Sequence, residues 1–220
     1  GSPLALAQAN EVRNKLLSLN QIDPEKVKIE IIKTSGDKFL NTSLSKIGGK
    51  GLFTKEIQQA LIDKRIDIAV HSMKDVETDL PEKLVISTIL KREDVRDSFI
   101  SRRYSSIADL PLGSVVGTSS LRRKAQLLNK RKDLKVVEFR GNVQKRLEKL
   151  DNNVAVATFL ATAGLNRLGL DELINPISTD EMLPAVAQGA VGIEHLRSEK
   201  MEEFLAPLND SISKKRVEAE

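Results

Sequence analysis

Short apolar runs rich in Val and Ile alternate along this chain with longer segments of helical periodicity. The predicted strands lie at 27–32, 66–70, 83–90, 97–101, 114–119, 134–139 and 154–161. The predicted helices lie at 2–19, 52–64, 120–131 and 142–150, and the first has Ser2 as N-cap and Pro3 at its first helical position. Strands and helices that alternate in this way predict an α/β fold with largely parallel sheets.

Size and composition set limits on this fold. The chain has 220 residues, 40% of them hydrophobic, which is enough for one large domain or two small ones. The charged run at 91–98 is a candidate crossover between two lobes. No apolar run reaches the length of a membrane span. With no cysteine, and two histidines that lack partner ligands at metal spacing, the sequence predicts neither disulfides nor a metal site.

The charge balance favours small anions over nucleic acid. Lys and Arg number 35 and Asp and Glu 31, which gives a net charge of +4. Nucleic-acid binders usually concentrate their basic residues in a stripe, often with stacking aromatics. Aromatic residues make up only 3% of this chain, and none is Trp.

A polar cluster follows the predicted strand at 66–70. His71, Ser72, Lys74 and Asp75 come in quick succession. In α/β sheets ligands gather at the carboxyl ends of strands, so this cluster is a candidate site. A surface loop with an ion pair is the alternative, and His71 alone is better explained as a structural residue.

A second cluster follows the strand at 114–119. Thr118 and Ser120 lead into a helix whose first turn carries Arg122 and Arg123. Cations at a helix N-terminus cost about 0.3–1 kcal/mol each at a surface, and a bound anion would relieve that cost. The sequence therefore predicts an anion site here. The alternative is a serine N-cap with incidental arginines.

Further basic residues stand near strand ends and glycines. Arg140 ends a strand, Arg146 lies on the next helix, and Arg167 follows a segment of small residues. A solvated helix face explains Lys145 and Lys149 well but Arg140 less well, and an ordinary helix start explains the segment before Arg167 about equally well. The glycine-rich segment 45–56, with Lys46 and Lys50, is interpreted as a mobile lid. Many cations around the single carboxylate of Asp75 indicate a substrate with several carboxylates, with Asp75 handling cationic or proton-transfer chemistry.

Six sequence blocks have the same order as in one known family. They are KIGGKGLF, IAVHSMKD, VGTSSLRR, RGNVQKRL, AGLNRLGL and LPAVAQGAVGIE. Over essentially its whole length the chain resembles the porphobilinogen deaminase (hydroxymethylbilane synthase) family. The resemblance implies two lobes like those of type II periplasmic binding proteins, with mixed, mostly parallel sheets, flanking helices and a cleft between the lobes. Domain 1 would comprise 1–92 and 190–208, rejoined through a strand at 189–196. Domain 2 would comprise 95–186, and 209–220 would begin a connection to a third domain.

The resemblance also implies an activity. The family is a transferase that joins four porphobilinogen molecules, with loss of ammonia, into hydroxymethylbilane during tetrapyrrole (haem) biosynthesis. It uses a dipyrromethane cofactor, bound through a thioether to a cysteine in the third domain. Because this chain has no cysteine and starts without the family's first strand, we expect a fragment at both ends that is inactive by itself.

Residue roles carry over by motif. Asp75 would be the catalytic carboxylate that stabilises the azafulvenium cation, and Lys50 would lie on a flexible loop near the substrate. The carboxylates of the dipyrromethane cofactor and the growing chain would be held by Ser2, Lys46, Ser72, Lys74, Thr118, Ser120, Arg122, Arg123, Arg140, Arg146 and Arg167. We expect a cytoplasmic monomer that acts on porphobilinogen and needs no nucleic acid, membrane or metal.

Two alternatives remain at this point. The first is a non-catalytic small-anion binding module of the same two-lobed fold, which would gain nothing from a negative Asp75. The second is a nucleic-acid binder that uses Arg122, Arg123, Arg131 and Lys132. On the ligand-binding hypothesis, Arg123→Ala is expected to impair ligand capture more than stability.

Overall fold

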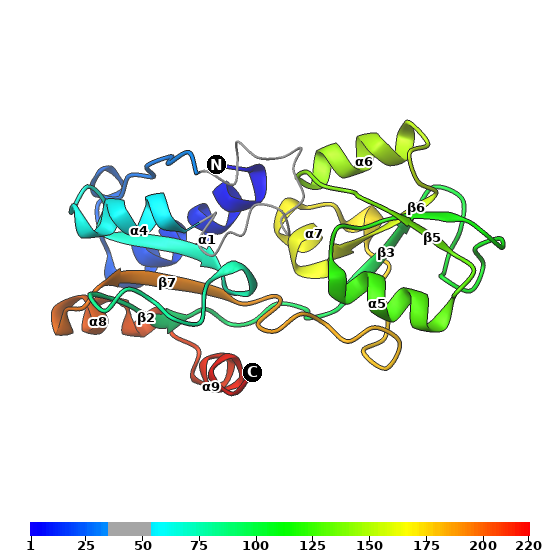
Figure 1. Ribbon diagram of the computed structural model, residues 1–220. Helices are drawn as coiled ribbons and strands as arrows, with labels where there is room; N and C mark the ends of the chain where they lie inside the picture. Colours follow the sequence, from blue (N-terminus) through cyan, green and yellow to red (C-terminus); the bar gives the residue numbers. More distant parts are fainter. Residues whose placement is uncertain (35–53) are drawn as a thin grey trace. The chain divides into compact units, whose positions relative to one another are not determined.

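A computed structural model describes residues 1–34 and 54–220, which form two compact units (Figure 1). Unit 1 comprises Gly1–Glu93 and Val186–Glu220, and unit 2 comprises Asp94–Ala185. The first passage between units falls inside the charged run at 91–98. Each unit has its own sheet and its own apolar core. No helix in the described ranges is long and apolar enough to cross a membrane.

Unit 1 is built on a three-stranded sheet in the order β1-β7-β2. The strands are β1 (Ile68–Ser72), β2 (Leu84–Ile89) and β7 (Val191–Leu196). The central strand β7 runs antiparallel to both neighbours, so β1 and β2 share one direction.

Helices cover both faces of this sheet because its strands alternate apolar residues between the two sides. The helices of unit 1 are α1 (Pro3–Asn20), α4 (Lys55–Ile62), α8 (Glu199–Leu205) and α9 (Ser211–Ala219). Leu16 of α1 and Leu205 of α8 share a core with Ile193, whereas Leu61 of α4 packs with Ala69 in a separate core. Single 3-10 turns complete the unit at η1 (Pro24–Lys26), η2 (Met73–Asp75) and η4 (Ala206–Leu208).

Unit 2 contains a four-stranded sheet in the order β3-β6-β4-β5. Its strands are β3 (Asp97–Ser101), β4 (Val115–Gly117), β5 (Lys135–Val137) and β6 (Ala157–Ala161). Strand β4 is parallel to β5 and β6, and β3 is antiparallel to β6. The helices are α5 (Leu121–Lys130), α6 (Val143–Asp151) and α7 (Thr162–Leu168), followed by η3 (Asp171–Leu173).

Two cores lie on opposite faces of the unit 2 sheet, and α5 and α6 cover opposite sides of it (Figure 1). Neighbouring residues of one strand enter different cores. Phe159 meets Phe99 edge-on, with ring centres 6.1 Å apart, in the core that includes Leu127 of α5. Leu160, the next residue, joins Leu150 of α6 in the other core. A shift of the register by one residue would exchange the two faces of the strand, so this alternation fixes the register of the sheet. It also fixes the face against which each helix packs.

The predicted element types agree with this architecture except at one place. The unit 2 sheet is mixed, because β4 is parallel to β5 and β6 whereas β3 is antiparallel to β6. In the unit 1 sheet both described pairs are antiparallel, so the expectation of largely parallel sheets does not hold there. The N-cap at Ser2 is also confirmed, because its Oγ accepts a hydrogen bond from the Ala5 amide at 3.2 Å. The prediction of a strand at 27–32 is wrong for the described structure. That segment pairs with no described strand. The Val27 carbonyl instead accepts a hydrogen bond from the Arg13 guanidinium.

Helix α9 packs beside β2 in unit 1, next to the places where the chain passes between units. Glu220 accepts hydrogen bonds from the Ala187 amide and from the Arg92 guanidinium. The Ser213 hydroxyl accepts a hydrogen bond from the Arg92 amide at 2.9 Å. Residues 209–220, expected to begin a connection, are therefore tied into unit 1 along this helix.

Candidate functional site

Three strand ends of unit 2 meet at one edge of its sheet. Strands β6, β4 and β5 are neighbours and parallel, so their carboxyl ends point the same way. Thr118 follows β4, Arg140 lies shortly after β5, and Thr162 begins α7 directly after β6. This is the edge at which α/β sheets usually bind ligands.

The turn from β4 into α5 is shaped by its own hydroxyl groups. Thr118 Oγ1 accepts a hydrogen bond from the Ser120 amide at 3.2 Å, and Ser120 Oγ caps α5 by accepting one from the Arg123 amide. Ser119 Oγ accepts one from the Phe139 amide at 2.9 Å, which ties the turn to the chain after β5. Each hydroxyl keeps its proton as a donor. Thr118 is buried and Ser120 is half-buried, so Ser120 is the more accessible of the two to a ligand.

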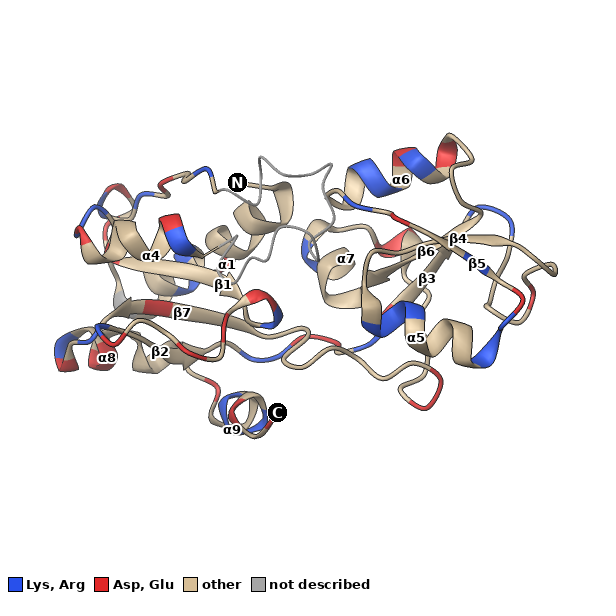
Figure 2. Ribbon diagram, in the orientation of Figure 1, with Lys and Arg blue, Asp and Glu red and all other residues tan. Residues whose placement is uncertain are grey.

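A buried carboxylate accounts for the two arginines in the first turn of α5, a helix with Lys and Arg at both ends (Figure 2). Asp97, the first residue of β3, is fully buried. Its Oδ1 accepts from Arg123 Nη2 at 2.6 Å, and its Oδ2 accepts from Arg122 Nη2 at 2.7 Å. In the described structure, Asp97 is therefore the anion that offsets the unfavourable interaction of these arginines with the helix dipole.

The two arginines differ in their surroundings. The Arg123 side chain is only 7% exposed and also donates to the Phe159 carbonyl at 2.8 Å. The Arg122 side chain is 23% exposed and donates to the Leu183 carbonyl. Arg123 thus has the contacts of a structural residue, whereas Arg122 reaches the surface.

The electrostatics of Asp97 follow from the same contacts. Burial alone would raise the pKa of its carboxyl group. The guanidinium groups of Arg123 and Arg122 outweigh burial and hold that pKa below the 3.8 of a free side chain. Asp97 is therefore charged at neutral pH. Its negative charge offsets the repulsion between the two arginines.

The other predicted arginines of unit 2 lie around the later strand ends. Arg140 precedes α6, and its carbonyl accepts a hydrogen bond from Lys149 Nζ at 2.9 Å. Arg146, on α6, donates through Nε to the Gly141 carbonyl at 2.9 Å. Arg167 lies near the end of α7. All three are half-buried, so each has part of its side chain available to solvent.

The predicted residues of unit 1 gather where β1 ends. Ser72 exchanges hydrogen bonds with the Gln8 side chain of α1, at 2.8 and 3.1 Å. Lys74 and Asp75 follow on the exposed turn η2. The Asp75 carboxylate makes no hydrogen bond or ion pair within the described part of the chain. Because no described residue pairs with the Asp75 carboxylate, this carboxylate is available to a ligand.

A buried polar network lies at the base of this turn. His71 Nε2 is 2.8 Å from Glu194 Oε2, and Gln58 donates to the other oxygen of Glu194 at 3.0 Å. All three residues are buried. They link β1, β7 and α4. His71 therefore has the contacts of a structural residue, as we expected for a lone histidine.

The remaining predicted residues divide by position. Ser2 caps α1 and is half-buried. Lys46 and Lys50, with the glycine-rich segment proposed as a lid, lie outside the described residues. In the described ranges there is no cluster of three or more His, Cys, Asp or Glu that could hold a metal ion.

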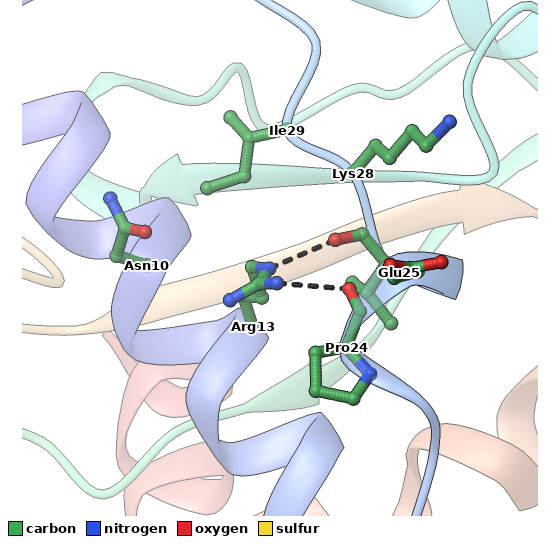
Figure 3. Close-up of a pocket in the computed structure, with 7 residues that line it drawn as sticks. Asn10, Arg13, Pro24, Glu25, Lys28 and Ile29 are labelled. Carbon is green, nitrogen blue, oxygen red and sulfur yellow. Dashed lines mark hydrogen bonds between the residues drawn. The ribbon is translucent and has the colours of Figure 1, made fainter.

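A cavity of about 510 Å³ lies elsewhere in unit 1, between α1 and the segment after it (Figure 3). Arg13 crosses it and donates to the Pro24 and Val27 carbonyls, both at 2.9 Å. None of the predicted site residues lines this cavity. Arg13 is occupied in fixing the chain after α1, so we assign the cavity no role.

Comparison with known proteins decides the family. The family model described as "porphobilinogen deaminase, dipyromethane cofactor binding domain" matches residues 1–203. The chain belongs to the porphobilinogen deaminase family. It is 54% identical to a porphobilinogen deaminase of Paracoccus denitrificans, over all of this chain and 71% of that protein. It is 55% identical to a chloroplastic porphobilinogen deaminase of Pisum sativum, over all of this chain and 61% of that protein.

A solved structure confirms the fold. A periplasmic substrate-binding protein of an ABC transporter from Coxiella burnetii matches with a TM-score of 0.54 at 13% identity, over 96% of this chain and 91% of that one. At this identity the likeness concerns the fold alone. It confirms the predicted α/β architecture of two units like those of type II periplasmic binding proteins.

Proposed function

We propose that this protein is a porphobilinogen-polymerising transferase of tetrapyrrole biosynthesis, a hydroxymethylbilane synthase. Family membership across the whole chain carries this proposal. The substrate, porphobilinogen, bears two carboxylates and an aminomethyl group. Four molecules are joined head to tail, and each joining releases ammonia.

The residues of unit 2 fit a carboxylate-bearing ligand and the dipyrromethane cofactor. Arg122, Arg140, Arg146 and Arg167 offer guanidinium groups, whose forks match carboxylates. Thr118 and Ser120 add hydroxyl donors at the start of α5. When bound, the cofactor supplies the pyrrole ring to which the first substrate unit is joined. None of the 220 residues is cysteine, so a thioether link would need a residue outside this sequence.

Asp75 is proposed to stabilise positive charge. When the protonated aminomethyl group of porphobilinogen breaks its carbon–nitrogen bond, neutral ammonia leaves and the positive charge remains, delocalised into the pyrrole ring. A fixed carboxylate beside that ring lowers the energy of the cation, because preorganised charge avoids the cost of reorienting water. The Asp75 carboxylate has no competing partner among the described residues, so it is available for this role. Lys74, beside it, would bind a substrate carboxylate.

Turnover by Asp75→Asn tests this proposal. The protein should include the residues by which its relatives exceed this chain, and ammonia release from porphobilinogen should be measured. We expect a loss of about 100- to 1000-fold in kcat with folding unchanged, the effect of removing one electrostatic stabiliser. The matched control is Asp79→Asn, an exposed acid four residues further on, which should keep full activity. Near-normal turnover by Asp75→Asn would favour a non-catalytic anion-binding module.

We further propose a cytoplasmic monomer that requires neither nucleic acid nor a membrane. The near-balanced charges and scarce aromatics support the first exclusion. Light scattering would test the monomer, and a filter-binding assay at low salt would test nucleic-acid binding. Cell fractionation would test both the location and membrane association.

A further inference from the structure

The carboxylate of Asp97 joins two guanidinium groups at the start of α5. Each of its oxygens accepts from a different arginine, at 2.6 and 2.7 Å. Asp97 is fully buried, and the Arg123 side chain is nearly so. Arg122 is the member of the cluster that reaches the surface.

The cluster has more positive than negative charge. Arg122 and Arg123 contribute +2 and Asp97 contributes −1, so the net charge is +2 − 1 = +1. The N-terminus of a ten-residue helix adds further positive potential. Arg123 Nε, also buried, has no hydrogen-bond partner. The net positive charge and the partly exposed side chain of Arg122 allow the cluster to attract a further anion.

Backbone hydrogen bonds fix the main chain of Asp97. Asp97 pairs with Ala161 in the ladder between β3 and β6, and its carbonyl accepts from the Ile177 amide at 2.8 Å. Arg122 has a long, partly exposed side chain and can change partners by rotating its bonds. A ligand carboxylate would therefore draw Arg122 away from Asp97, while Arg123 stays.

We propose that Asp97 is a resident counter-anion that competes with a ligand carboxylate for Arg122 and so sets the affinity of this site. The inference rests on the proposed function, because that function supplies a ligand with carboxylates. Without a ligand, Asp97 keeps two close cations from repelling each other. With one, it weakens binding enough for a growing product to be passed on and released.

The proposal predicts an effect on affinity opposite in sign to that of a purely structural role. Asp97→Asn removes one negative charge a few ångströms from the ligand and should tighten propionate binding about tenfold. A purely structural Asp97 would leave binding equal or weaker, because its loss would disorder the arginines. The matched control is Asp133→Asn in the same unit, which removes a carboxylate paired with Arg131. That variant should bind propionate like the wild-type chain.

The test uses the whole 220-residue chain and propionate as the probe. Dissociation constants come from the NMR shifts of the Arg122 and Arg123 Nε–H groups, and dispersed amide signals verify that each variant is folded. If Asp97→Asn does not fold, the wild-type chain still gives an answer. The ¹³C signal of the Asp97 carboxyl should move as propionate is added, and that of Asp133 should not.

Two results overturn the inference: unchanged or weaker propionate binding by folded Asp97→Asn, or an Asp97 carboxyl signal that does not respond in the wild-type chain. Neither result bears on Asp75, whose test measures turnover of porphobilinogen. Failure of this inference is therefore distinguishable from failure of the proposed function.

Discussion

Replacing Arg123 with Met should destabilise unit 2 strongly. Methionine keeps most of the apolar stem but removes the guanidinium group. The buried Asp97 then loses its contact at 2.6 Å, and the Phe159 carbonyl loses its donor at 2.8 Å. Removing one partner of a buried ion pair typically costs about 3–5 kcal/mol, because the other partner remains buried. Arg122 still neutralises Asp97, so the variant should fold at neutral pH.

The single tyrosine of the chain makes this loss measurable in unit 2 alone. Tyr104 packs against the core that contains Phe159, and there is no Trp, so tyrosine fluorescence reports the unfolding of this unit. With a slope of about 2 kcal/mol per M urea, the unfolding midpoint of Arg123→Met should fall by about 1.5–2.5 M.

An exposed ion pair of the same unit provides the control. In the Arg102–Asp151 pair the side chains are 47% and 54% exposed. Exposed pairs contribute about 0–1 kcal/mol, so Arg102→Met should shift the midpoint by no more than about 0.5 M. If Arg123→Met destabilises no more than Arg102→Met, the assignment of Arg123 as a structural cation is wrong. The earlier expectation, that losing Arg123 mainly impairs ligand capture, would then stand.

Two further predictions concern unit 2. The pKa of Asp97 is lower in the folded than in the unfolded state, so its ion pairs stabilise the fold above the unfolded value of 3.8. That stability should be lost as the pH falls from about 4 through the folded pKa, and urea midpoints in Asp97→Asn should fall less on acidification than those of the wild-type chain. Gly117→Ala should cost about 1–3 kcal/mol, because a Cβ there would lie 2.3 Å from the Phe139 ring; a midpoint within error of wild type would show that the ring can move aside.

Local sequence patterns predicted most elements of the fold because those patterns reflect local physics. The strand at 97–101 was predicted with its observed bounds, since Phe99 and Ile100 form a short apolar run beside charged breaks. The segment 27–32 is richer in β-formers, with one Val and three Ile, but no described strand lies beside it. β-propensity measures suitability for a sheet and does not supply a partner, so the prediction failed there.

The candidate site was predictable only in part. The sequence showed that Arg122 and Arg123 oppose the helix dipole, and from this we predicted that an anion binds near them. It could not show that the anion is Asp97, which lies 25 residues before Arg122 and begins an apolar strand. An acid at the head of a buried strand was the available signal. The hydrogen bond between Gln8 and Ser72 joins residues that are 64 positions apart, so no local sequence pattern could predict it.

The position of β7 has a consequence for how the protein is made. This strand fills the middle of the unit 1 sheet, yet the ribosome makes it only after every residue of unit 2. Until then β1 and β2 lack β7, the described strand that joins them, and Val12 and Leu16 lack part of their core. Unit 2 is one continuous segment and can complete itself first. Of the two units, the one whose first segment is synthesised first is therefore the one that completes its described sheet later.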